Sequence, residues 1–144
     1  MGNIDRYIPL AFEAIKKVAL TDPKDTAKTN RFIKNDDRNT SNKYIPKGYK
    51  GYISSLGANI IQAGVKTAIY FYEAKESSSE GDKRLITAAI RFMLHPDEQN
   101  TAEYDKYNLS EKLSSDAHKL QIQTLQIMDA ATALKIALRT YSMK

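Results

Sequence analysis

The chain contains no cysteine among its 144 residues. This absence excludes disulfides, thiol catalysis, cysteine-ligated zinc and iron–sulfur clusters, and it fits a reducing compartment. Long apolar runs are lacking as well, because the longest uncharged stretch, from Gly51 to Val65, is too short to span a bilayer. Asp5 and Arg6 precede any apolar run, so we expect no signal peptide. The expected class is a soluble, cytoplasmic protein with a single domain over residues 1–144.

Acidic residues are scarce in one segment of the chain. Lysine and arginine number 22 overall against 17 aspartates and glutamates, which gives a net charge of +5. Residues 24–50 hold eight of the basic residues and only three of the acidic ones, so this segment carries the whole excess. No apolar residue occurs between Lys34 and Lys43, and such a stretch buries too little surface to offset its ordering entropy. We therefore predict a basic, flexible loop over about residues 22–45.

Elsewhere the apolar residues recur at helical spacing, and no segment has the pattern of a strand pair. The predicted helices cover about residues 5–20, 46–75 and 82–95, a short turn near 109–113, and a last helix capped by Ser114 or Ser115. Asp116 would complement the N-terminal dipole of that last helix. The predicted fold class is all-α: a single-domain bundle of about five helices with a long C-terminal helix.

The helix over residues 46–75 has two adjoining apolar stripes, which predicts a central helix packed on both sides. The stripes consist of Ile53, Leu56, Ile60, Ala63 and Thr67, and of Ile61, Val65, Ala68 and Tyr72. A glycine inside a helix costs about 1 kcal/mol relative to alanine, and we expect a kink near Gly64.

Residues suited to catalysis or metal binding are few. His95 and His118 have no partner at metal-ligand spacing. The acidic residues at 97–98 and 103–105 lie in an expected loop without a nearby base. The glycines of Lys47–Gly51 lack the spacing of a phosphate-binding loop. We therefore expect no catalytic residue, no metal, no cofactor and no enzymatic activity; an enzyme would need a polar cluster inside the bundle, and the pattern contains none.

The basic segment allows two interpretations. Most basic loops are only solvated, but concentrated lysines also bind polyanions by releasing counterions from phosphates. Tyrosines at 44, 49 and 52 alternate with lysines at 43, 47 and 50, a combination that suits nucleic acid. The same tyrosines would equally begin the core face of the next helix.

The start of the second helix adds a mild signal for phosphate. Lys47 and Lys50 would stand at the positive end of the helix dipole, where a cation is disfavoured by ~0.3–1 kcal/mol. An anion bound at that end would reverse the balance, because helix N-termini bind phosphates readily. Screening by salt would instead make the penalty negligible.

The same region carries a resemblance to a known family. Residues 47–56 read KGYKGYISSL, residues 60–65 read IIQAGV, and AIYF at 68–71 precedes Lys75. Together with a long C-terminal helix that ends in ALKIALR at 133–139, this run resembles the signature of the CRISPR-associated Cmr small-subunit family. The signature covers about thirty residues, and the order of elements agrees over the whole chain.

The resemblance implies a non-catalytic, all-helical subunit of the type III-B RNA-targeting effector complex, which serves antiviral defence. Its implied partners are the other subunits of that complex, copies of itself in a head-to-tail stack, and guide RNA paired with target RNA; no membrane is involved. Contacts would go to phosphates and helix shape rather than to base edges.

The residues expected to bind RNA are assigned from charge placement, because the family motif does not fix them. They are Lys43, Lys47 and Lys50, followed by Lys16, Lys17, Lys135 and Arg139. The alternative function is a helical protein–protein interaction module whose basic loop binds an acidic protein partner.

Overall fold

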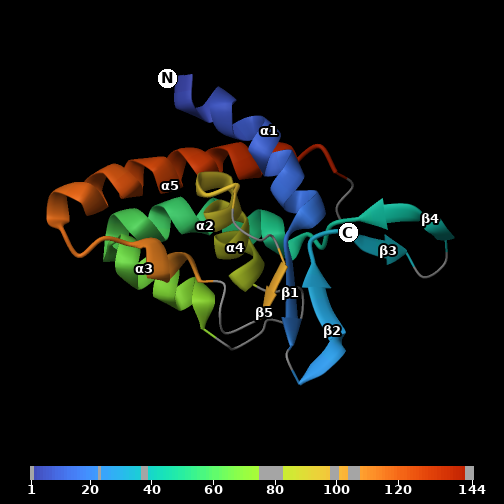
Figure 1. Cartoon of the computed structure of the whole chain (residues 1–144). Coiled ribbons are helices and arrows are strands. Elements are labelled where there is room, and N and C mark those ends of the chain that lie inside the picture. The colour runs from blue at the N-terminus through green and yellow to red at the C-terminus, as the bar shows by residue number, and fades with distance from the viewer. Residues whose placement is uncertain are drawn as a thin grey trace.

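The computed structural model describes residues 2–22, 24–36, 39–74, 83–97, 101–103 and 108–141. Over these residues five α-helices and one short 3-10 helix form a bundle, with short strands beside one end of it (Figure 1). The helices are α1 Gly2–Lys17, α2 Gly48–Ala63, α3 Val65–Glu73, α4 Lys83–Leu94, η1 Leu109–Lys112 and α5 Ala117–Leu138. The predicted all-α bundle with a long C-terminal helix is therefore confirmed, since α5 has 22 residues.

The central helix of the bundle is α4. Every residue from Arg84 to Met93 is buried, because α4 packs against α1, α2, α3 and α5. Its sequence is apolar or small around most of the circumference, and each fully buried Leu, Ile or Phe contributes about 1.5–3 kcal/mol of stability. The prediction that the second helix is the central one is wrong, because Ser54, Ser55 and Ile61 of α2 are exposed.

The helix predicted over residues 46–75 is two helices that meet at Gly64. This glycine has φ 92° and ψ 156°, a backbone conformation that side chains with a Cβ avoid. Its N–H still donates to the Ile60 carbonyl, and its own carbonyl accepts from Ala68. The predicted kink is confirmed as a full break. The buried face of the chain changes at the break. Ile61, three residues before Gly64, is 75% exposed, whereas Val65, directly after Gly64, is buried.

The longest helix packs against the first one through small residues. Ala11 and Ala14 of α1 are fully buried, as are Ala133 and Ala137 of α5, and alanines let two helix backbones approach closely. Figure 1 shows α1 crossing the C-terminal half of α5. Beyond the crossing, the rings of Phe12 and Tyr141 lie 6.4 Å apart between centroids.

The strands occupy the segment that was expected to be a loop. They are β1 Ala19–Asp22, β2 Asp25–Arg31, β3 Lys34–Asp36, β4 Asn39–Tyr44 and β5 Thr101–Glu103. β1 pairs with β2 in antiparallel and with β5 in parallel orientation, and β3 and β4 form a separate antiparallel hairpin that projects from the bundle (Figure 1). The expectations of no paired strands and of a loop over about residues 22–45 are therefore wrong for the described part of this segment.

Apolar residues at the ends of this segment explain the difference. Leu20, Phe32 and Ile45 are buried in the core, so the chain is fixed to the bundle before β2, between β2 and β3, and after β4. The intervening polar residues then need only pair their backbone groups with each other. For the same reason α1 ends at Lys17 rather than near residue 20, because the chain continues as the buried strand β1.

The positions of α4 and η1 agree with expectation, whereas the N-cap of α5 does not. α4 and η1 lie where helices were predicted over 82–95 and 109–113. The cap of α5 is Asp116, whose carboxylate accepts from the backbone N–H groups of His118 and Lys119, at 2.9 and 3.1 Å, rather than Ser114 or Ser115. No helix in the described ranges is long and apolar enough to cross a membrane.

Candidate nucleic-acid interface

The N-cap residue and the first turn of α2 carry two lysines and no acidic residue. Lys47 is the N-cap residue, no side chain caps the helix, and its first turn contains no acidic residue. Lys47 and Lys50 are both exposed. Because the positive end of the helix dipole lies beside these two ammonium groups, this end of α2 has a positive potential that favours anions.

Lys43 lies just before this helix, near the end of β4. Its Cα is paired with that of Asn35 on β3, and its side chain is exposed. The buried residues Ile45 and Tyr49 hold the connection from β4 to α2 against the core. The three lysines ranked first from the sequence therefore lie on one continuous, anchored stretch of backbone.

The tyrosines between these lysines have structural roles. Tyr49 is buried, with its ring 5.0 Å from that of Phe32 and 5.9 Å from that of Tyr52. Tyr44 and Tyr52 are half-buried. The interpretation that these tyrosines begin the core face of the next helix is therefore confirmed for Tyr49. Its ring is packed in the core and cannot stack on a base.

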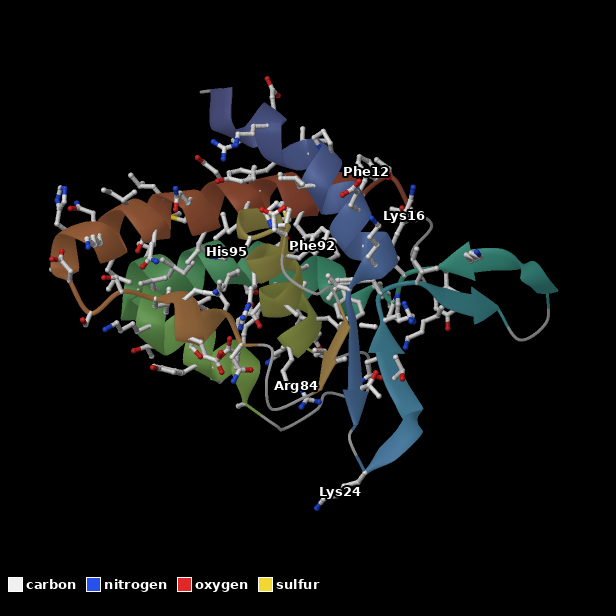
Figure 2. All side chains as sticks on the ribbon, viewed as in Figure 1. Phe12, Lys16, Lys24, Arg84, Phe92 and His95 are labelled. Atoms are coloured by element: carbon white, nitrogen blue, oxygen red, sulfur yellow. The ribbon has the colours of Figure 1, made fainter. Side chains whose placement is uncertain are left out.

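The second-ranked basic residues lie at the C-terminal ends of two helices. Lys16 and Lys17 are exposed in the last turn of α1, and half-buried Lys135 and exposed Arg139 lie at the end of α5. Both helices end on the side of the molecule where α2 begins (Figure 1), and Lys16 is labelled on that side in Figure 2. Cations at helix C-termini also stabilise the helix dipole by ~0.3–1 kcal/mol, so these four residues have a structural function whether or not they bind a ligand.

A groove beside the start of α2 was not expected from the sequence. Phe71 and Tyr72 of α3, Tyr52 of α2 and Lys83 of α4 line it, and its volume is about 440 Å³. The Lys83 ammonium lies 4.7 Å from the centroid of the Phe71 ring. Sequence periodicity does not reveal this cluster, because its members come from three helices that only the fold brings together.

The half-buried carboxylate of Glu73, at the end of α3, has defined partners. It accepts hydrogen bonds from the Ser110 hydroxyl at 2.6 Å and from the Ser110 backbone N–H at 3.1 Å. Burial raises the pKa of the Glu73 carboxyl, although the hydrogen bonds from Ser110 lower it. The arrangement joins α3 to η1.

Within the ranges that the structure covers, no group of three or more His, Asp or Glu side chains is close enough to hold a metal ion. His95 follows α4 and is half-buried, whereas His118 is exposed in the first turn of α5. Of the two acidic clusters, Asp97 is exposed, and residues 98, 104 and 105 lie outside the described residues.

Comparison with known proteins identifies a family. Residues 11–138 match the family model described as CRISPR-associated protein (Cas_Cmr5). The match extends from α1 to the last residue of α5 and includes every proposed RNA-binding residue except Arg139, which follows it directly. No curated protein and no solved structure gives a significant match.

Proposed function

Because the chain belongs to the Cas_Cmr5 family of CRISPR-associated proteins, we propose that it is a non-catalytic subunit of a type III-B RNA-targeting effector complex. In this role it acts in the cytoplasm as part of antiviral defence. Its partners are the other subunits of the complex, further copies of itself in a stack, and the guide RNA paired with target RNA.

The observation that carries RNA contact is the positive charge at the N-terminus of α2. Lys43, Lys47 and Lys50 are exposed there on a rigid backbone, and the first turn of the helix has no acid. Backbone phosphates are the ligands that such a surface binds, with little dependence on sequence. Lys16, Lys17, Lys135 and Arg139 belong to the ends of α1 and α5, which lie on the same side of the molecule (Figure 1), and are proposed as secondary contacts.

The test is fluorescence anisotropy with labelled single-stranded and duplex RNA over a range of salt concentrations. We expect the affinity to fall log-linearly with salt, by about 0.7 log units per contacted phosphate for each tenfold increase on a single strand. The triple variant Lys43→Ala/Lys47→Ala/Lys50→Ala should bind more weakly and show a smaller salt slope.

A control of equal charge separates a local contact from a general charge effect. Lys66 of α3 and Lys119 of α5 are exposed and belong to the first turns of helices that begin at the opposite end of the molecule (Figure 1). Lys66→Ala/Lys119→Ala should leave RNA binding nearly unchanged, whereas Lys47→Ala/Lys50→Ala should weaken it. Equal losses in the two double variants would contradict an interface at α2. Tight binding to an acidic protein partner with none to RNA would instead favour the interaction-module alternative.

A further inference from the structure

The groove between α2, α3 and α4 has the chemistry of a nucleotide site. Its volume of about 440 Å³ lies within the range of roughly 300–1,000 Å³ that is usual for small-molecule pockets. Its lining combines aromatic rings, one ammonium group, and the neutral hydrogen-bonding side chains of Ser55 and Asn59. Among the residues that the structure describes, no carboxylate lines it.

The cation in the groove is held against aromatic rings. The Lys83 Nζ lies 4.7 Å from the centroid of Phe71, 5.4 Å from that of Tyr52 and 6.0 Å from that of Tyr72. These distances are in the range of cation–π attraction. Lys83 therefore keeps its positive charge at the wall of the groove rather than extending it into solvent.

The wall behind the cation is rigid. Tyr72 is 2% exposed, its hydroxyl donates to the Tyr52 carbonyl, and a side-chain hydrogen bond links it to Asn59. Burial raises the pKa of Tyr72 to about 12. In front of this wall Phe71 is 60% exposed, which leaves ring surface available to a ligand.

The groove is continuous with the basic start of α2. Gly48 and Gly51 line it, and they alternate with Lys47 and Lys50 in the first turn of the helix. A Cβ added at Gly51 would meet no atom within 4 Å, so the space beside the backbone is open at this point. The groove therefore lies beside the turn of α2 that carries the two lysines.

We propose that this groove binds one unpaired nucleotide of RNA, with its base stacked against Phe71 and its phosphate beside Lys83. The inference rests on the RNA contact proposed above and adds a preference for unpaired RNA. A base within a duplex has both faces stacked and cannot enter the groove, whereas base–aromatic stacking is available to every unpaired base. The site thus distinguishes single strands from duplexes without reading sequence.

The test compares two neighbouring aromatic residues of α3. Phe71→Ala removes the stacking ring, and Tyr70→Ala is its control, because Tyr70 is 59% exposed but does not line the groove. For single-stranded RNA we expect Phe71→Ala to weaken binding by about fivefold or more and Tyr70→Ala to have no effect. Duplex binding should change in neither variant. A 2-aminopurine placed in the single strand should lose fluorescence on binding to the wild type and to Tyr70→Ala, but not to Phe71→Ala.

A second variant fills the groove without removing the ring. Ser55→Leu adds bulk at an exposed position of its lining and should lower the affinity for single strands while leaving duplex affinity intact. Equal single-strand affinities for Phe71→Ala, Ser55→Leu and Tyr70→Ala would overturn the groove proposal. The proposed function would survive that result if the lysine variants still lost binding. Absence of all salt-sensitive RNA binding would overturn both.

Discussion

At the scale of single residues, the charged side chains of half-buried Glu73 and buried Arg91 fasten η1 to the bundle. Glu73 accepts two hydrogen bonds from Ser110. Arg91 of α4 donates to the Asn108 carbonyl at 2.7 Å and lies 3.5 Å from the Glu111 carboxylate. Neutral hydrogen bonds contribute about 1 kcal/mol each, and those to charged groups about 1.5–3 kcal/mol. These contacts offset part of the cost of burying the two charges and fix the connection into α5.

Replacement of Glu73 separates its hydrogen bonds from its charge. Glu73→Ala leaves the Ser110 N–H and hydroxyl without their acceptor and should lower the free energy of unfolding by about 1–3 kcal/mol. Glu73→Gln keeps an acceptor and removes the cost of burying a charge, so at pH 7 it should be no less stable than the wild type. Urea unfolding at pH 7 measures both effects. A loss in Glu73→Gln as large as that in Glu73→Ala would show that the charge itself is required.

The Glu73→Gln variant also tests how the free energy of unfolding depends on pH. Because burial raises the pKa of Glu73, the folded protein binds the proton at a higher pH than the unfolded chain. The contribution of this group to stability is therefore greatest below the unfolded pKa and is lost as pH rises through the folded pKa. Relative to Glu73→Gln, the wild type should gain stability as the pH is lowered from 7 toward 4.5. A relative loss over that interval would contradict the assigned shift.

At the scale of elements, helices were predictable wherever burial follows a 3.6-residue period. α4, η1 and α5 therefore lie close to their predicted ranges. The strands were not predictable, because they depend on buried residues at the ends of the segment, such as Phe32 and Ile45, and on backbone pairing between polar residues. The lysines of the candidate interface are neighbours in sequence and could be named from it. The Phe71–Lys83 contact joins two helices, so the sequence could not predict it.

Replacing two glycines of this region by alanine should change the stability in opposite directions, because Gly64 forms the break between α2 and α3 whereas Gly57 lies inside α2. Gly64 has φ 92°, so Gly64→Ala should destabilise the protein by ~1–3 kcal/mol through backbone strain. Gly57 lies inside α2 with nothing within 4 Å of an added Cβ, so Gly57→Ala should stabilise it by ~0.5–1 kcal/mol. Thermal unfolding of both variants under identical conditions checks the pair. A stabilising Gly64→Ala would mean that α2 and α3 readily join into one helix.

At the scale of the whole molecule, three exposed apolar side chains lie away from the candidate RNA-binding lysines. The candidate RNA-binding lysines lie where α2 begins, whereas Ile61 at the end of α2 and Ile122 and Leu125 near the start of α5 lie toward the other end (Figure 1). These three side chains are 75%, 48% and 63% exposed. Exposed apolar groups on a helical face are typical of protein contacts. A subunit that binds RNA at one end and protein at the other is the arrangement that the proposed stack needs.

The contribution of α5 to that stack can be measured directly. Ile122 and Leu125 are three residues apart and so share one face of α5. Because both are largely outside the core, Ile122→Ser/Leu125→Ser should leave the unfolding temperature nearly unchanged. It should reduce the concentration-dependent self-association seen by sedimentation velocity and the recovery of the protein with its complex. Gln121→Ser/Gln126→Ser alters two exposed polar residues of the same helix and should change neither. If the apolar variant assembled as fully as this control, the contacts between subunits would have to lie on another face, and the charged end would have to serve both RNA and protein.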